Sequence, residues 1–208
     1  MTESMFPDVP PPIPAEADRK ARRLVIVSVA SAVLILVALV CVRIWVLQPF
    51  SIASRGMYPT AKPGKMVVVC KLAYASASDV KRGDLVAYRI KVGGFDEVYF
   101  HRVIGIPGDR ISTNAFEVIL NGERVPQKYL SDVREDGALM SLFEEKLGDR
   151  QYVIAVGRSG SAAQAKQFSG AITVPADCFF VMGDNRTNSA DSRHTGFVKF
   201  PDVVGRKF

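Results

Sequence analysis

The pattern of apolar and polar positions divides the chain into one long apolar run followed by many short ones. Residues 24–42 contain no charged side chain, and the apolar residues 44–47 can extend this run past Arg43. At about 1.5 Å per residue, a helix over the run nearly crosses a hydrocarbon core of about 30 Å. The pattern therefore predicts one transmembrane helix over residues 24–47, preceded by a polar tail over residues 1–23.

The apolar run can be read as a cleaved signal peptide or as an uncleaved signal-anchor. A cleaved signal has a shorter apolar core and a small-residue cleavage site after it. Here Arg43 and Trp45 stand where that site would be, which favours the anchor. Because basic residues 19–23 precede the run, we expect the N-terminus in the cytoplasm and residues 48–208 in the periplasm or outside the cell. The expected location is thus a single-pass anchor in the cytoplasmic membrane.

Beyond residue 47 the apolar segments are short, rich in β-branched residues and separated by turn residues, a pattern typical of strands. The segments are Met66–Val69, Leu85–Ile90, Val98–Ile106, Phe116–Leu120 and Cys178–Met182. Asn121-Gly122 predicts a hairpin, because a type I′ turn needs positive φ at both central residues. We expect a mainly β, antiparallel domain over residues 48–208, with residues 115–175 as an inserted hairpin subdomain.

Two segments of the expected insertion differ from this β pattern. Gly137–Leu147 is predicted as a short helix, and residues 158–170, rich in Ser, Gly and Ala, as a flexible surface loop. The part of the chain expected outside the cytoplasm contains Cys70 and Cys178, which could form a disulfide there. Two buried free thiols explain the same apolar surroundings, so both alternatives stay open.

Charge and composition narrow the classes of function. The formal net charge of +6 is spread along the chain, and no basic stripe or recognition module indicates nucleic-acid binding. A mildly basic face towards anionic membrane lipid is the better interpretation. No Cys or His cluster has metal-ligand spacing, so we expect no metal and no cofactor.

One segment is far more polar than the strand before it. Met182–Arg193 reads MGDNRTNSADSR and directly follows an apolar run. Asp, Asn and Ser compete with helix and strand for backbone hydrogen bonds, so this composition predicts a loop. A strand that leads into a dense polar loop usually leads into a functional site or a buried hydrogen-bonded corner.

Four separated segments, taken in order behind the anchor, carry a resemblance to a known family. They are FSIASRGMYPT at 50–60, KRGDLV at 81–86, YFHRVIGIPGD at 99–109 and GDNRTNSADSRHTGFV at 183–198. Together they resemble type I signal peptidases, the membrane-bound Ser/Lys endopeptidases that remove export signals. The resemblance covers nearly the whole chain beyond residue 24. It implies a β domain of signal-peptidase type on one transmembrane anchor.

The resemblance also implies a mechanism, from which this chain departs at two positions. In the family, a serine before the Met of S-M-x-P-T attacks the scissile carbonyl, and a lysine before the Arg of K-R-V-x-G-x-P-G-D is the base. Those positions are Gly56 and His101 here. Glycine has no side chain to attack with. Histidine is less damaging, because a neutral imidazole with a pKa of about 6.5 can act as a base, and endoplasmic-reticulum relatives use histidine there.

Other positions match the family pattern. The resemblance places Ser54 at the oxyanion-binding hydroxyl and Ser189 at the serine that hydrogen-bonds the base. It implies that five charged residues support the site structurally: Arg102, Asp184, Arg186, Asp191 and Arg193. It also implies that three residues shape the substrate groove: Arg55, Met57 and Pro59. Arg55 replaces a small residue, and its long side chain could fill part of the groove.

Plainer interpretations stay open beside these roles. The charged residues can be a structural ion-pair corner, His101 a hydrogen-bonded strand histidine, and Ser54 an ordinary loop serine. Ser54 is a poor substitute nucleophile, because two residues of extended chain displace it by roughly 6–7 Å, more than near-attack geometry tolerates.

Two functions therefore remain. One is a catalytically silent or impaired homologue at the membrane that binds exported peptides or a pilus or secretion assembly partner. The alternative is an active signal peptidase that cleaves exported preproteins or pilins with unusual catalytic residues. Enzymatic activity stays open, because a hydroxyl is missing at residue 56.

Overall fold

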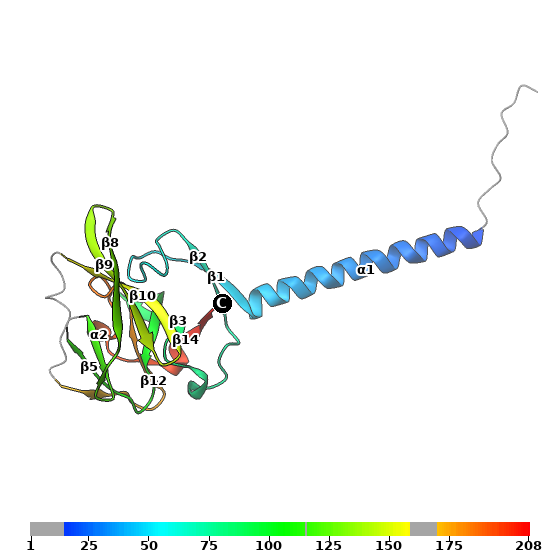
Figure 1. Ribbon diagram of the computed structural model, residues 1–208. Coiled ribbons are helices and arrows are strands. Elements are labelled where there is room, and N and C mark those ends of the chain that lie inside the picture. Colours follow the sequence, from blue (N-terminus) through cyan, green and yellow to red (C-terminus); the bar gives the residue numbers. More distant parts are fainter. Residues whose placement is uncertain (1–14, 115, 159–169) are drawn as a thin grey trace, which may run out of the picture. The chain divides into compact units, whose positions relative to one another are not determined.

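The computed structural model describes residues 15–114, 116–158 and 170–208 and divides into two compact units, Met1–Ile44 and Trp45–Phe208. Most of the polar tail (residues 1–14) and most of the expected surface loop (159–169) lie outside the described residues. The first unit consists of helix α1, Ala15–Trp45 (Figure 1). Its segment Asp18–Trp45 contains an 18-residue window with a mean hydropathy of 3.1, and by length and composition the segment can cross a membrane. The side chains of residues 19–45 are exposed.

The second unit is built on a seven-stranded antiparallel sheet (Figure 1). The strand order is β1 (Leu47–Ser51), β2 (Met66–Cys70), β14 (Val203–Lys207), β3 (Leu85–Val92), β4 (Phe95–Gly105), β12 (Cys178–Met182) and β13 (Val198–Lys199). Strand β12 lies beside β4 although more than seventy residues separate them in sequence. Because Met182 pairs with Arg102, the polar loop that follows β12 begins beside Arg102, next to His101 in β4.

Two smaller antiparallel sheets complete the unit. One has the order β10 (Arg150–Gly157), β9 (Ala138–Leu147) and β8 (Gln127–Glu135). The other has the order β11 (Ile172–Thr173), β5 (Arg110–Asn114), β6 (Glu117–Leu120) and β7 (Glu123–Arg124). Short helical turns occur at η1 (Ala77–Asp79), α2 (Ser192–Thr195) and η3 (Phe200–Asp202). The predicted mainly β, antiparallel class is confirmed, whereas the limits of the inserted subdomain at 115–175 stay a prediction.

The helix predicted over Gly137–Leu147 is wrong, because Ala138–Leu147 forms strand β9 and pairs with β8 and β10 on its two sides. Asp136 and Gly137 have φ values of 48° and 81°, and they form the tight turn between β8 and β9. Leu, Met, Glu and Lys favour a helix in isolation, but pairing along both edges overrides that weak preference. The predicted hairpin at Asn121-Gly122 is confirmed by φ values of 55° and 90°.

The core lies on both faces of the large sheet. Along β3, Leu85 and Ala87 pack on one face, while Val86 and Tyr88 pack on the other. A third apolar cluster, which includes Ile104, lies where the large sheet meets the smaller ones. Because side chains alternate along a strand, the register of the β3–β4 pair decides which residues share a face.

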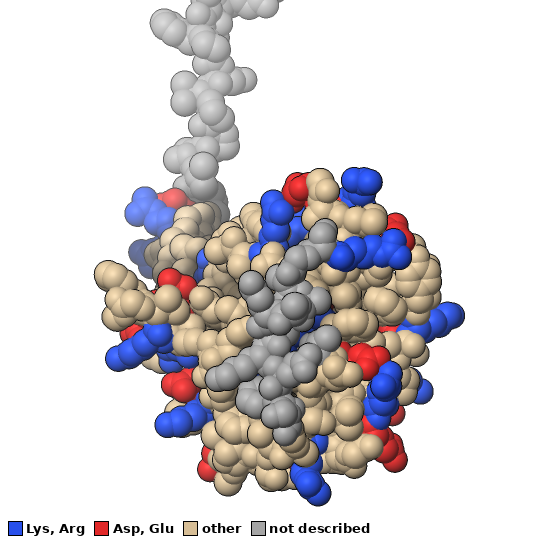
Figure 2. Space-filling view, turned by 90° about the vertical axis from the view of Figure 1, so that its left-hand side faces the viewer, with Lys and Arg blue, Asp and Glu red and all other residues tan. Residues whose placement is uncertain are grey.

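Cys70 and Cys178 are both free and half-buried, which leaves the two-thiol alternative and not the disulfide. On the face shown in Figure 2, basic and acidic side chains are interspersed. The positive net charge is thus not gathered into one patch on that face.

Candidate active site

Three segments that are distant in sequence line one pocket of about 300 Å³. They are residues 51–57 after β1, residues 97–101 of β4 and residues 188–190 of the loop after β12. Apolar side chains of Ile52, Met57 and Phe100 lie along it. The pocket thereby combines an apolar wall with hydroxyl groups of Ser54 and Ser189.

Strand register brings His101 into this pocket. In the β3–β4 pair, Val86 lies opposite His101 and Tyr88 lies opposite Tyr99. Tyr88 is therefore a diagonal neighbour of His101 on the same face of the sheet, within reach of a long side chain. The Tyr88 hydroxyl oxygen lies 2.7 Å from Nδ1 of His101. The other ring nitrogen, Nε2, lies 3.0 Å from Oγ of Ser189.

His101 is almost fully buried, and this determines its charge. Burial lowers the pKa of His101 to about 4, although the carboxylates of Asp191 and Asp184 act in the opposite direction. The imidazole is consequently neutral near pH 7. Both of its nitrogens have hydrogen-bond partners, so the side chain is held in one orientation.

Position 56 is held by its backbone and leaves space for a side chain. Its carbonyl accepts a hydrogen bond from the backbone N–H of Asn185 at 3.0 Å, and its N–H donates to Oγ of Ser54 at 3.4 Å. A β-carbon placed on Gly56 would lie 3.5 Å from Oγ of Ser189 and 3.6 Å from Oγ of Ser54, which is ordinary van der Waals contact. A serine would therefore fit at residue 56, with its side chain beside the Ser189–His101 pair.

The loop after β12 approaches position 56 so closely that residue 183 of the loop must be a glycine. A β-carbon on Gly183 would overlap Oγ of Ser189 and the carbonyl oxygen of Gly56. The Gly183 N–H donates to Oδ2 of Asp191 at 2.9 Å. Asp191 in turn holds the Nε and Nη2 of Arg193 at 2.9 and 2.8 Å. Burial opposes ionisation of Asp191, but Arg193 lowers the pKa of the carboxyl to about 2.

Two further buried ion pairs lie beneath the loop. Nε of Arg102 donates to Oδ1 of Asp184 at 2.8 Å, and Nη2 donates to Oδ2 at 2.6 Å. Arg186 pairs with Glu145, to which its Nη1 donates at 2.7 Å. Paired guanidinium–carboxylate contacts of this kind offset the cost of removing both charges from water. The five charged residues that the sequence singles out therefore all take part in buried hydrogen bonds beneath the pocket.

The remaining predicted groove residues take different positions. Met57 is buried in the core, and Pro59 follows a cis peptide bond. Arg55 lines the pocket, but its Nη2 lies 2.6 Å from Oδ2 of Asp136 in the turn between β8 and β9. Both side chains are about half exposed, at 52% and 55%. Arg55 also lines an adjoining cavity of about 330 Å³, so it lies between two hollows.

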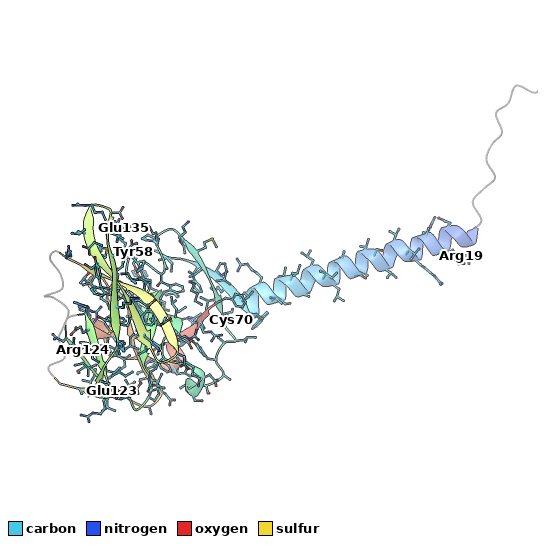
Figure 3. The ribbon with its side chains drawn as sticks, in the orientation of Figure 1. Arg19, Tyr58, Cys70, Glu123, Arg124 and Glu135 are labelled. Carbon is cyan, nitrogen blue, oxygen red and sulfur yellow. The ribbon has the colours of Figure 1, made fainter. Side chains whose placement is uncertain are left out.

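A second contact joins the loop at 55–63 to the β8–β9 hairpin. Tyr58 and Glu135 lie side by side in Figure 3, and their hydrogen bond helps to raise the pKa of the phenol, after burial and the charge of Glu135. Nζ of Lys62 lies 2.9 Å from Oε1 of Glu135. The hairpin is therefore tied to the chain on either side of Tyr58.

Sequence reasoning missed two residues of the site, Tyr88 and Glu145. A signal for Tyr88 existed, because the Gly93-Gly94 turn between β3 and β4 sets the register that places it beside His101. Glu145 lies in the segment expected as a helix, and the sequence predicts no role for it. Only the three-dimensional pairing of β9 shows that it faces Arg186.

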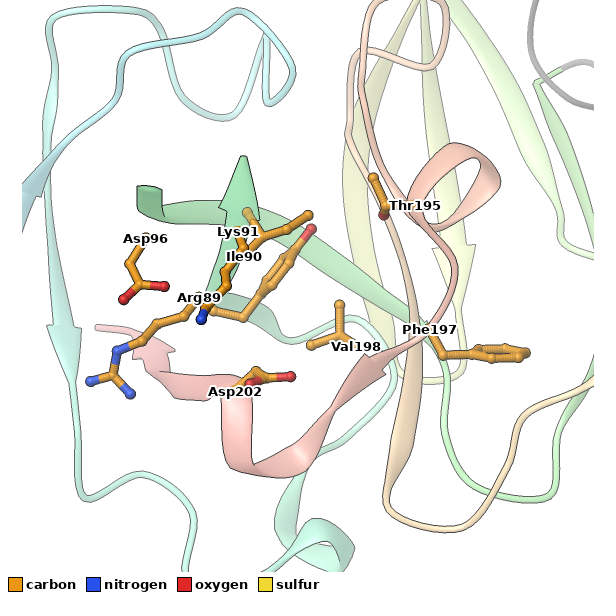
Figure 4. A pocket seen from close by; sticks show the side chains of 9 residues that line it. Arg89, Ile90, Lys91, Asp96, Thr195, Phe197, Val198 and Asp202 are labelled. Carbon is orange, nitrogen blue, oxygen red and sulfur yellow. The ribbon is translucent and has the colours of Figure 1, made fainter. Parts of the chain in front are cut away.

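A further cavity of about 330 Å³ adjoins the same region (Figure 4). Tyr88 contributes to its wall, together with charged residues at its mouth that include Lys91, Asp96 and Asp202. The Tyr88–His101 hydrogen bond thus joins residues that line two different cavities. Across the described ranges, no group of three His, Cys, Asp or Glu side chains is placed to hold a metal ion.

A helix long and apolar enough to cross a membrane thus precedes a β domain with a buried histidine, flanking serines and an apolar pocket. This chain belongs to the signal peptidase family, because residues 25–208 match the model of the family described as signal peptidase, peptidase S26. The resemblance inferred from the four motifs is confirmed. Signal peptides at a membrane are the substrate class of this family, and its members are membrane-anchored.

Two curated proteins and one solved structure are similar to this chain. The chain is 33% identical to signal peptidase I of Bacillus caldolyticus, over 79% of each chain. It is 32% identical to signal peptidase I of Pseudomonas aeruginosa, over 82% of this chain and 63% of that protein. A crystal structure of a signal peptidase I from Enterococcus faecalis matches 61% of this chain and 95% of that one, with 25% identity and a TM-score of 0.35.

Proposed function

We propose that this protein is a signal-peptidase-like membrane protein that binds exported peptides without cleaving them. The observation that carries the proposal is Gly56, which stands at the nucleophile position with its backbone held by Asn185 and Ser54. The pocket around it contains peptide-binding groups but lacks the hydroxyl that would attack. The pocket would therefore bind a peptide without cleaving it.

The pocket suits an extended peptide with small apolar side chains. Ile52, Met57 and Phe100 offer an apolar wall within about 300 Å³. Gly56 N–H and the nearby serine hydroxyls offer hydrogen bonds to a backbone carbonyl. A few convergent polar groups on an apolar surface are typical of sites that fix the orientation of a ligand.

The proposed setting is the cytoplasmic membrane, crossed once by α1. The basic residues 19–23 before the apolar run favour a cytoplasmic N-terminus and place the β domain on the other side. The proposed partners are exported preproteins or proteins of pilus or secretion assembly. Anionic lipid would attract the mildly basic chain to the membrane surface.

A direct test offers the purified full chain, in detergent, a preprotein with an Ala-x-Ala cleavage site. The expected result is saturable binding by photo-crosslinking and no cleaved product. The matched control is Gly56→Ser, which adds the missing hydroxyl with ordinary contacts. Efficient cleavage by the unaltered chain that survives Ser54→Ala and vanishes with His101→Ala would overturn the proposal.

A second candidate function rests on the 3.0 Å distance between Oγ of Ser189 and Nε2 of His101. A serine within hydrogen-bond reach of a neutral histidine has the geometry of an activated nucleophile. Ser189 lines the pocket, and Gly56 leaves space beside it. In this case the protein would be an active signal peptidase with unusual catalytic residues. Cleavage abolished by Ser189→Ala, but not by Ser54→Ala, would identify this mechanism.

A further inference from the structure

The hydrogen bonds around His101 discriminate between these two functions, because they specify which ring nitrogen carries the proton. A neutral imidazole has one protonated and one unprotonated nitrogen. To activate Ser189, Nε2 must be the unprotonated nitrogen and accept the serine proton. The partner of Nδ1 therefore decides whether Ser189 can become a nucleophile.

That partner is the hydroxyl of Tyr88, which has one proton to donate. Tyr88 is only 2% exposed, and among the described residues its hydroxyl has His101 as its hydrogen-bond partner. If Nδ1 carried a proton, it would donate to Tyr88, and the phenolic proton would be left buried without an acceptor. If Nδ1 is unprotonated, it accepts the phenolic proton and both groups are satisfied.

We infer that Tyr88 is a positioning residue that holds His101 with its proton on Nε2, so that Ser189 acts as a hydroxyl donor to a bound peptide carbonyl and not as a nucleophile. In this arrangement the phenol donates to Nδ1, and Nε2–H donates to Oγ of Ser189. The proton of the serine hydroxyl is then free to point into the pocket beside Gly56. The inference rests on the proposed peptide-binding function and supplies its polar contact.

Charge states agree with this chain of hydrogen bonds. Burial, with the nearby charge of Asp191 and the neighbouring Tyr99, raises the pKa of Tyr88 far above its usual value, so the phenol keeps its proton. Burial lowers the pKa of His101 to about 4, so the ring is neutral near pH 7. The direction of proton donation thus runs from Tyr88 through His101 to Ser189, without any charged member.

The tautomer can be measured directly, because the chain contains only two histidines. The full chain, labelled with ¹⁵N-histidine and purified without a polyhistidine tag, is studied in detergent micelles at pH 7 by nuclear magnetic resonance. The exposed His194 is assigned with the His194→Gln variant. For His101 we expect a protonated, pyrrole-like signal at Nε2 and an unprotonated, pyridine-like signal at Nδ1. A protonated Nδ1 in the unaltered chain would overturn the inference.

Two variants show whether Tyr88 is the cause. Tyr88→Phe removes the hydroxyl and should shift the His101 signals towards the other tautomer or towards an average of the two. Tyr99→Phe is the matched control, because the Tyr99 ring also packs against His101, with centroids 6.0 Å apart, whereas the two ring nitrogens face Tyr88 and Ser189. It should leave the signals unchanged. Unchanged signals in folded Tyr88→Phe would contradict the role of the hydroxyl.

This measurement needs no peptide, so its outcome is independent of the proposed binding function. A His101 ring protonated on Nε2 in a protein that binds no exported peptide would sustain the inference about Tyr88 and refute the peptide-binding proposal. Peptide binding by a protein with protonated Nδ1 would do the reverse.

Discussion

Two regions of the pocket depend on the rest of the fold to very different degrees. At the rim, Gly56 and the exposed Arg55 contact the chain through the backbone and one solvent-exposed ion pair. At the base, the ion pairs Arg186–Glu145 and Arg193–Asp191 are buried almost completely. Substitutions at the rim should therefore change the free energy of unfolding little. Removing one charged group at the base would leave its partner buried and unpaired.

Under the proposed function, this difference explains how a chain can have a complete structural base beneath a site that has no side chain at residue 56. The buried pairs hold the loop after β12 against position 56, and the fold needs them whether or not a peptide is cleaved. A side chain at residue 56 would change the packing little, because a β-carbon there makes ordinary van der Waals contacts and overlaps nothing. A loop after β12 with the sequence typical of the family therefore indicates the fold, but it does not show that the protein is active.

The largest expected effect comes from breaking a pair at the base. Glu145→Ala leaves the fully buried guanidinium of Arg186 without its carboxylate. We expect the free energy of unfolding to fall by about 3–5 kcal/mol, measured by urea denaturation of the full chain in detergent. Glu117→Ala, which breaks the exposed pair with Arg124, is the control, with an expected loss below about 1 kcal/mol. Equal losses in both variants would show that a buried ion pair at the base contributes no more to stability than an exposed one.

The pH dependence of stability gives the next largest effect. The pKa of His101 is about 4 in the folded protein and about 6.5 when unfolded, so between these values the unfolded chain binds more protons. Stability should therefore fall as the pH is lowered from 6.5 to 4, by about 3 kcal/mol in total. Asp191, with its pKa of about 2, contributes in the same direction only below about pH 4.

Urea denaturation of three proteins over this pH range checks the assignment. The unaltered chain and His194→Gln should lose stability with nearly the same slope, because His194 is exposed. His101→Gln should show a clearly flatter curve, since its neutral amide cannot gain a proton. The groups that face residue 101 are the same in all three proteins: Asp184, Asp191, Arg193, Tyr88 and Tyr99. The same slope in His101→Gln would show that another group is responsible.

Features of the fold that depend on local sequence could be predicted, and features that depend on distant contacts could not. The apolar N-terminal helix and most of the strands could be predicted, because hydrophobic pattern and turn residues specify them locally. The Asn121-Gly122 hairpin was predicted from its turn residues alone. In the Gly137–Leu147 segment, the equally informative Asp136-Gly137 turn was outweighed by residues with high helix propensity, and the prediction was wrong.

The pairing of buried charges could not be predicted in the same way. Arg186 is forty-one residues from Glu145, and nothing local in either segment indicates the partner. Tyr88 differs, because the register of one hairpin suffices to place it beside His101. Pairings set by local turns are thus accessible from sequence, and pairings set by the packing of separate sheets are not.

The variant Gly56→Ser tests the proposal that the protein does not cleave peptides because residue 56 has no hydroxyl. Gly56→Ser should change the free energy of unfolding by less than about 1 kcal/mol, since its β-carbon makes ordinary contacts. It should also create slow cleavage of an Ala-x-Ala preprotein, limited by the proton on Nε2 of His101. Adding Tyr88→Phe should raise that rate about tenfold, the equivalent of one lost buried hydrogen bond.

Gly56→Ala is the control for this series, because it adds the β-carbon without the hydroxyl. It should fold as well as Gly56→Ser and cleave nothing. A folded Gly56→Ser protein with no activity, alone or with Tyr88→Phe, would mean that the groove as well as the nucleophile position has departed from the peptidase pattern.

The smallest expected effect concerns Arg55 and Asp136 at the rim. Each single change to alanine should alter the free energy of unfolding by less than about 0.5 kcal/mol, because both side chains are about half exposed. Their effects on peptide binding should differ. Asp136→Ala frees the Arg55 guanidinium to enter the pocket that Arg55 lines, and should weaken binding about threefold. Arg55→Ala should not weaken it. Binding is measured by fluorescence anisotropy of a labelled signal peptide. If the double variant binds like Arg55→Ala, Asp136 acts by holding Arg55 out of the pocket. If it binds like Asp136→Ala, the carboxylate of Asp136 contacts the peptide itself.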